Sequence, residues 1–162
     1  MSDHLERTFV ALKPDAVKRG IVGDVITRLE RSGMRLAATR MLRADDEILE
    51  QHYSEHVDKD FYEGLRDFMK EGPVIAMVWE GVNAVANVRK LVGDTAPREA
   101  DPGTIRGDFA HVSFEHADSE GKAVKNLIHA SGNKEEAEKE VSIWFDDAEI
   151  HEYDRADEEH VQ

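Results

Sequence analysis

The chain has 162 residues, 40% of them hydrophobic, which is enough for one core and predicts a single domain over residues 1–162. Asp and Glu number 35 against 21 Lys and Arg, and the resulting net charge of −14 disfavours binding to nucleic acid. The absence of cysteine excludes disulfides and thiolate metal sites. Acidic residues are spread along the whole chain. This is typical of a well-solvated surface or, in the interpretation we favour, of a protein adapted to a high-salt cytosol.

The sequence also argues against a membrane protein. No apolar run approaches the ~20 residues that a bilayer-spanning helix needs. The first residues are polar and lack the apolar region of a signal peptide. We therefore expect a cytoplasmic protein without a membrane partner.

Apolar periodicity divides most of the chain into strands and helices. In chain order the pattern predicts a strand at 8–12, a helix at 21–32, a strand at 35–42, helices at 45–56 and 61–69, a strand at 74–79, a helix at 83–91 and a strand at 141–145. Without the additional helices, this order is β-α-β-β-α-β. It predicts an α/β (α+β) ferredoxin-like fold, with a four-stranded antiparallel sheet and helices on one face.

Three segments lack a clear period. Residues 94–108 are rich in Gly, Pro and Thr, and loops of this length are more often functional than idle. Residues 110–125 are polar and contain two histidines. The acidic tail, about 146–162, is expected to be loosely held or partly disordered.

The segment Asn126–Glu140 combines a histidine with a legible helix start. His129 ends a short apolar run, and Asn133 is a good N-cap with Glu136 three residues on, as in a capping box. Glu140 lies on the same helix face as Glu136 and can point back toward the helix N-terminus. The segment could therefore hold an imidazole beside a carboxylate near a helix end that favours anions.

Side chains suited to phosphate stand at the ends of several predicted segments, and Arg is the better clamp because its planar fork binds bidentately. They are Lys13, Arg89, Thr95, Arg106, Asn126 and His129. Taken singly, each is more simply read as a solvated polar group, and Lys13 is either a solvated strand end or a cation held at a cleft. Walker A, G-x-G-x-x-G and H-E-x-x-H motifs are absent. His52 and His56 have metal-compatible spacing, but without a metalloprotease pattern we interpret them as surface or packing residues.

Several stretches together resemble the nucleoside diphosphate kinase family. They are residues 7–17 (RTFVALKPDAV), His52-Tyr53, residues 72–81 (GPVIAMVWEG), residues 102–109 (PGTIRGDF) and residues 126–131 (NLIHAS). These motifs agree with the family in order and spacing, and the resemblance runs from about residue 7 to about residue 153. The family's ferredoxin-like fold agrees with the predicted element order.

The resemblance implies a ping-pong transfer of the γ-phosphoryl group from a nucleoside triphosphate such as ATP to a nucleoside diphosphate. His129 matches the nucleophile, which is phosphorylated on Nδ1. Glu140 matches the glutamate that orients the imidazole, and Ser131 the residue that holds this glutamate. Tyr53 matches a residue near the histidine, and Phe61 matches the residue that stacks on the base. Lys13 and Asn126 match residues that contact the sugar hydroxyl, and Lys13 also contacts the γ-phosphate. The residues that match those holding the phosphates are Arg89, Thr95 and Arg106.

The resemblance also implies that Mg²⁺ arrives bridging the nucleotide's phosphates, so no protein residue is expected to ligate a metal. It implies a homo-oligomer, with a hexamer favoured and a tetramer or dimer as alternatives. The competing interpretation is a ferredoxin-like nucleotide-binding or regulatory domain that has lost catalysis. That interpretation predicts a degraded histidine site, whereas the family's site residues are present in this sequence.

The chain departs from the family pattern at several points. Gly132 replaces the usual aspartate, so we infer that Asn133 carries the helix cap, and Asp60 replaces a proline before Phe61. The segment between Phe109 and Asn126 is longer than usual. One apolar residue there should cover the base, and the candidates are Val112, Phe114, Ala123 and Val124. The C-terminus lacks the aromatic piece that packs on a neighbouring subunit in the family, which affects assembly.

Overall fold

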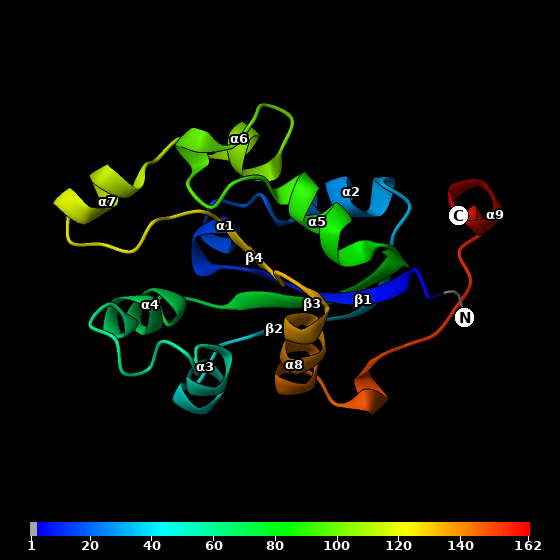
Figure 1. Ribbon diagram of the computed structural model, residues 1–162, viewed down its shortest axis with the longest axis horizontal. Helices are drawn as coiled ribbons and strands as arrows, with labels where there is room; N and C mark the ends of the chain where they lie inside the picture. Colours follow the sequence, from blue (N-terminus) through cyan, green and yellow to red (C-terminus); the bar gives the residue numbers. More distant parts are fainter. Residues whose placement is uncertain (1–2) are drawn as a thin grey trace.

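The computed structural model describes residues 3–162 and is built around one antiparallel sheet (Figure 1). Its strands are β1 (Leu5–Leu12), β2 (Arg35–Leu42), β3 (Val74–Val82) and β4 (Ile128–Ala130), in the order β2-β3-β1-β4. Eight residues of β1 pair with β3, whereas β4 pairs with β1 over only three positions. The predicted four-stranded antiparallel sheet with ferredoxin-like order is confirmed, and β2 and β4 form its edges.

Helices cover both faces of this sheet, because alternate residues of each strand point to opposite sides. On one face, Val10 and Leu12 of β1 pack with α2 (Val22–Arg31) and α5 (Ala84–Val92). The other face packs against α3 (Asp46–His52), α4 (Tyr62–Met69) and α8 (Lys134–Trp144). The prediction of helices on one face was therefore wrong, since β1 and β3 are apolar on both sides and each side needs a cover.

One predicted strand is helical in the structure. Residues 141–145 form the last turn of α8 and its C-cap, and the fourth strand is β4 instead. Val141 and Trp144 are three residues apart, so they share a helix face and both are buried in the second core cluster. The period of a five-residue apolar run does not distinguish a strand from a helix. The prediction of residues 141–145 as the fourth strand is therefore wrong, and residues 128–130 form that strand.

Short helices occupy the segments without a clear period, and one more, α1 (Pro14–Lys18), directly follows β1. Those in the three segments are η1 (Pro97–Glu99), α6 (Ile105–Phe109), α7 (Phe114–Ser119), η2 (Asp147–Glu149) and α9 (Glu158–Val161). Among them, the hydroxyl of Thr104 caps α6 by accepting from the backbone N–H of Gly107, and that of Ser113 caps α7 by accepting from the backbone N–H of His116. None of the helices within residues 3–162 has both the length and the hydrophobicity of a membrane-spanning segment.

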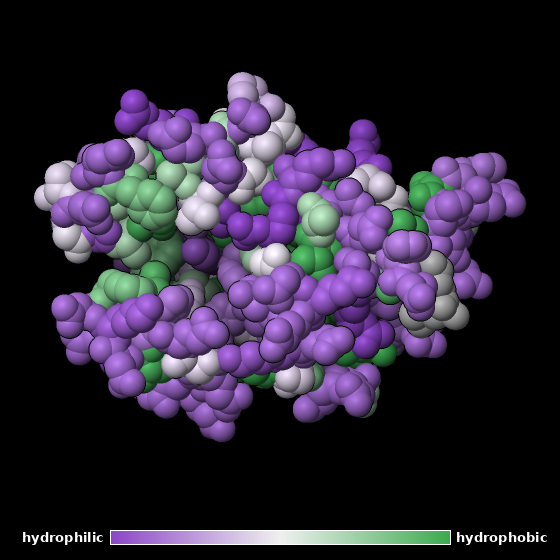
Figure 2. All heavy atoms as spheres, in the orientation of Figure 1, coloured by the Kyte–Doolittle hydropathy of each residue, from purple (hydrophilic) through white to green (hydrophobic). Residues whose placement is uncertain are grey.

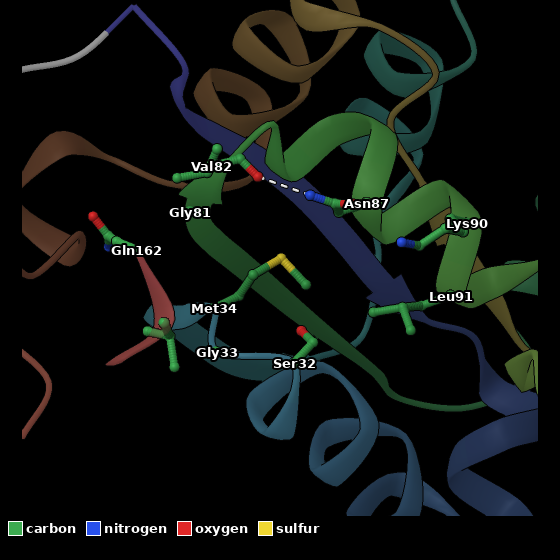
Figure 3. A pocket seen from close by; sticks show the side chains of 10 residues that line it. Ser32, Gly33, Met34, Gly81, Val82, Asn87, Lys90, Leu91 and Gln162 are labelled. Carbon is green, nitrogen blue, oxygen red and sulfur yellow. Dashed lines mark hydrogen bonds between the residues drawn. The ribbon is translucent and has the colours of Figure 1, made fainter. Parts of the chain in front are cut away.

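The C-terminal tail is held along β2 rather than loosely attached, contrary to expectation. The backbone N–H of His151 donates to the carbonyl of Ala37 over 2.8 Å, and the Tyr153 hydroxyl donates to the carbonyl of Leu36 over 2.7 Å. Arg155 donates to two carbonyls at the end of α2 and the start of β2. The last residue, Gln162, lines a hollow with the turn before β2, the end of β3 and α5 (Figure 3).

Candidate active site

His129 is the central residue of β4, and the strand's alternation sets its direction. Ile128 and Ala130 point into the cluster that contains α2 and α5. His129 therefore points to the opposite face, where α3 and α8 lie. Its register partner on β1 is Ala11, and its ring centroid lies 6.0 Å from that of Phe9. The histidine is fixed by the sheet on one side and leaves a quarter of its side-chain surface exposed.

The helix after β4 returns a carboxylate to this histidine. Asn133 caps α8, with its Oδ1 accepting from the Glu136 N–H over 2.8 Å, as predicted. The Glu136 carboxylate accepts from the Gly132 N–H instead of that of the cap. Two turns into α8, Glu140 Oε2 lies 2.8 Å from His129 Nε2, and its Oε1 accepts from the Ser131 hydroxyl over 2.6 Å. The predicted group of His129, Glu140 and Ser131 is assembled.

The Glu140 carboxylate remains ionised in this setting. Burial by itself would raise the pKa of Glu140, but the hydrogen bond and charge of His129 lower the pKa further, and His52 and Ser131 add to this. An ionised carboxylate at Nε2 keeps a proton on that nitrogen. The lone pair of His129 is then on Nδ1, to which no other residue within 3–162 makes a hydrogen bond.

A second group forms where β1 ends. Lys13 Nζ donates to Asn126 Oδ1 over 2.8 Å, and the Asn126 amide donates to the carbonyl of Thr95 over 2.9 Å. These three predicted residues come from different loops, and they meet beside the start of β4. Burial, helped by the charge of Arg106, lowers the pKa of Lys13 to about 8, while Asp15 opposes the shift. Lys13 is therefore a cation near neutral pH and close to losing its proton.

The backbone between Asn126 and His129 makes a tight turn. Leu127 has φ of +73°, and the Ile128 N–H donates to the carbonyl of Asn126, as in the rarer γ-turn. A bulky residue at this φ is strained and persists only where its surroundings hold it. Leu127 is buried, its N–H donates to Asp15 and its carbonyl accepts from the Lys13 N–H. This turn ties the cation at the end of β1 to the segment that carries the histidine.

Two arginines line the open edge of β4. Arg89 Nη1 donates to the carbonyl of Ala130 over 3.3 Å. Arg106 donates to three carbonyls, those of Gly93, Asn126 and Ile128, and only 3% of its surface is exposed. Burial, helped by Arg89, lowers the pKa of Arg106 to about 10, so it keeps its charge. Three of its five N–H groups are engaged with carbonyls, so Arg106 positions the histidine segment and leaves two N–H groups for an anion.

His52 belongs to the site, although we interpreted it as a surface or packing residue. Its ring centroid lies 4.6 Å from that of His129, with the two rings nearly perpendicular. Its Nδ1 accepts from Trp144 Nε1 over 3.1 Å and lies 3.4 Å from Glu140 Oε2. Burial, with the charge of His129, lowers the pKa of His52 to about 3, so this imidazole is neutral. Its place next to Tyr53 in the sequence was the available signal.

Tyr53 is part of the same aromatic group. Its ring centroid lies 4.7 Å from that of His52, in an edge-on arrangement. Burial, with the charges of Glu140 and Tyr62, raises the pKa of Tyr53 to about 12. The phenol therefore keeps its proton and can act as a hydrogen-bond donor near His129.

The residues that we expect to contact the nucleotide base lie away from the cluster around His129. Phe61 precedes α4, is about half exposed, and has its nearest ring or cation neighbours in His56 and Lys59. Phe114, at the start of α7, is also about half exposed. Figure 2 shows a hollow between α7 and α4, with hydrophobic surface on both sides. Among the base-covering candidates, Val112 and Ala123 line a small hollow against α7, and Val124 is partly buried.

Comparison with known proteins identifies the family. The profile described as nucleoside diphosphate kinase matches residues 6–150. The chain belongs to the nucleoside diphosphate kinase family. It is 47% identical over 154 residues to the nucleoside diphosphate kinase of Natronomonas pharaonis, covering 94% of each chain.

Solved structures of nucleoside diphosphate kinases share this fold. The enzyme of Borrelia burgdorferi, described as a transition-state mimic with bound vanadate and ADP, superposes with a TM-score of 0.91 at 41% identity, covering 97% of this chain and 96% of that one. A halophilic nucleoside diphosphate kinase from Halobacterium salinarum, in complex with CDP, superposes with a TM-score of 0.87 at 44% identity, covering 98% and 99%. The family identified from the sequence and the fold seen in the structure are therefore consistent with each other.

Proposed function

We propose that this nucleoside diphosphate kinase transfers the γ-phosphoryl group from a nucleoside triphosphate such as ATP to a nucleoside diphosphate through a phosphohistidine on His129. The hydrogen bond between His129 Nε2 and Glu140 is the observation that carries the proposal, because it leaves Nδ1 with a free lone pair. Imidazole is nucleophilic near pH 7 and needs little activation. The same geometry disfavours the inactive alternative, since His129, Glu140 and Ser131 retain their contacts.

The first half-reaction forms one bond and breaks one. Nδ1 of His129 attacks the γ-phosphorus, and the bond from this phosphorus to the bridging oxygen breaks, so the diphosphate leaves with the electron pair. Glu140 accepts from Nε2–H throughout and stabilises the positive ring that forms. A second nucleoside diphosphate then attacks the phosphohistidine along the reverse path, which makes the mechanism ping-pong.

The cationic side chains beside β4 are placed to bind the phosphates of the nucleotide. Phosphoryl transfer passes through a loose transition state with negative charge on the equatorial oxygens, so fixed cations stabilise it. Lys13 approaches from the end of β1, and Arg89 and the two free N–H groups of Arg106 approach from the edge of β4. Asn126 and Thr95 complete the polar wall. This placement supports the phosphate and sugar roles that the family resemblance implies.

A divalent ion enters as part of the substrate. We infer that Mg²⁺ bridges the phosphates of the nucleotide, because it prefers oxygen ligands and retains water. Within residues 3–162, the group of side chains arranged for a metal is His52, His129 and Glu140, and two of its three donors are nitrogen. That donor set does not suit Mg²⁺, which agrees with a metal carried by the nucleotide.

The proposal is tested by incubating the protein with γ-labelled ATP and Mg²⁺. We expect an acid-labile, alkali-stable phosphoprotein that loses its label when a nucleoside diphosphate is added. His129→Ala should abolish labelling, whereas His116→Ala, which removes an exposed histidine of α7, should label like the wild type. Equal labelling of His129→Ala, or an unlabelled wild type, would rule the proposal out.

A further inference from the structure

A cavity of ≈ 450 Å³ opens between the α3 region and α8. Its lining includes His52, His56 and His129. Four of the lining residues are glutamates, and Lys139, the one Lys or Arg in the lining, donates to the Ser54 hydroxyl over 2.7 Å. The Nε2 side of His129 therefore faces an acidic space, whereas Lys13 and the arginines lie toward the proposed phosphate site.

Three metal-ligating side chains meet at the inner end of this cavity. One donor atom each from His52, His129 and Glu140 lies within 4.8 Å of the others. Glu140 Oε2 is 2.8 Å from His129 Nε2 and 3.4 Å from His52 Nδ1. Ligand atoms about 2.0–2.1 Å from a tetrahedral Zn²⁺ lie roughly 3.3 Å apart. Small side-chain shifts therefore convert this cluster into a three-ligand site.

The contact between His52 and Glu140 is itself favourable to a cation. His52 Nδ1 accepts a hydrogen bond from Trp144 Nε1, so this nitrogen carries no proton to donate to the carboxylate. Two electron-rich atoms thus face each other over 3.4 Å in a buried place, where only 2% of the His52 side chain is exposed. A metal ion between them would replace repulsion with two bonds.

We propose that His52, His129 and Glu140 form an inhibitory Zn²⁺ site, entered from the acidic cavity and separate from the Mg²⁺ of the nucleotide. Two imidazoles and one carboxylate are a donor set that Zn²⁺ uses, with water in the fourth position. Mg²⁺ is disfavoured because it prefers oxygen donors. The two ions are therefore separated by ligand chemistry and by the side from which they approach His129.

Zinc at this site would switch off the nucleophile through its tautomer. A metal bound to Nε2 of His129 displaces the proton from that nitrogen, and the neutral ring then carries its proton on Nδ1. Nδ1 is the atom proposed to attack phosphorus, so its lone pair is lost and phosphorylation stops. This consequence rests on the proposed function, whereas zinc binding itself does not.

The binding test uses the full-length, nucleotide-free protein with Zn²⁺ in calorimetry and Co²⁺ as an absorbing substitute. We expect one ion per chain and a Co²⁺ spectrum with nitrogen ligands. His52→Gln should weaken zinc binding by at least about tenfold, since a ligand contributes no less than the outer-shell groups whose loss costs 10- to 100-fold. The matched control is His56→Gln, which lines the same cavity outside the cluster and should bind zinc like the wild type.

A second variant gives a gain rather than a loss. Trp144→Phe removes the N–H that occupies His52 Nδ1 and leaves an aromatic ring in the core. We expect several-fold tighter zinc binding, because the metal no longer has to displace a hydrogen bond. Unchanged or weaker binding in a folded Trp144→Phe protein, or weakened binding in His56→Gln, would overturn the site as placed here.

Turnover separates the two proposals. With Mg²⁺ held in excess, added Zn²⁺ should inhibit wild-type phosphoenzyme formation, a zinc-selective chelator should restore it, and His56→Gln should be inhibited alike. A wild type that is inactive with Mg²⁺ alone but binds zinc would refute the proposed function and retain the metal site. An enzyme active with Mg²⁺ that binds no zinc would refute only the metal site.

Discussion

At the scale of single residues, the chemistry of His129 is set by what stands on each side of its ring. Glu140 holds Nε2, and Lys13 and Asn126 are joined by a hydrogen bond near the start of the same strand. The turn before this strand places Leu127 at a strained positive φ. The burial of the Leu127 side chain and two hydrogen bonds of its backbone hold it in this conformation. The side chains with shifted pKa values around His129, among them those of Lys13, His52, Arg106 and Glu140, gather near the end of β1.

Lys13 makes the proposed catalysis sensitive to alkaline pH. Its pKa of about 8 means that the ammonium form is lost as the pH rises above that value, so kcat/KM should fall there. The phosphates of a bound nucleotide raise the pKa of Lys13, so kcat should hold to higher pH. Folding stability has the opposite trend, since between pH 8 and 10.5 the unfolded chain holds more protons and stability from this group rises with pH.

The control for this prediction keeps the charge and changes the pKa. Lys13→Arg should have lower turnover but no loss of kcat/KM near pH 8, because a guanidinium remains protonated. Lys139→Arg, at the acidic cavity, should keep the wild-type pH profile. Persistence of the alkaline limb in Lys13→Arg would assign it to another group.

At the scale of elements, α8 connects the site with the core. Its first turn is capped by Asn133, its middle presents Glu140 to His129, and its last turn buries Trp144 against Phe9, with ring centroids 5.3 Å apart. α7, by contrast, is a six-residue helix with a single buried residue, Ala117. The two helices have the same kind of cap but differ in how firmly they are tied to the fold.

The two caps provide a matched pair of substitutions. Asn133→Ala should lower the free energy of unfolding by about 1 kcal/mol, because an N-terminal N–H of α8 loses its partner. Ser113→Ala removes the equivalent bond from α7 but should change global unfolding much less, since a peripheral helix can open by itself. Urea denaturation followed by circular dichroism measures both. Equal losses would show that α7 unfolds with the core.

At the scale of the whole molecule, charge and assembly are the properties that local contacts do not fix. A net charge of −14 repels anionic nucleotides and opposes compaction at low ionic strength. The purple surface in Figure 2 shows how widely polar and charged residues cover this face. The tail adds to the enclosure of the sheet, because it occupies part of the open edge of β2.

Salt should therefore favour the folded, active protein. We expect kcat/KM and the unfolding temperature to rise from low salt to about 1 M KCl, where the Debye length is ~3 Å. Activity that only falls with added salt would contradict adaptation to a high-salt cytosol. Mass measurement over the same series tests the expected homo-oligomer, with a hexamer favoured, and a monomer at every salt concentration would exclude it.

Local signals in the sequence determined much of this fold. The three longer strands and the cap at Asn133 depend on neighbouring residues, so they were predicted correctly. Motif spacing around His129 was sufficient to recognise the family. These features share a physical cause, since propensity, capping and periodicity act over a few residues.

The tertiary structure decided what depends on distant partners. β4 has only three residues, so its pairing with β1 selects it as a strand, whereas packing against Phe9 keeps the Trp144 region helical. His52 enters the site because α3 meets α8, and its partner Trp144 lies 92 residues away. Arg106 was expected at phosphates but also holds three carbonyls of loops and β4. Such contacts have no local signature, because only the folded chain brings their partners together.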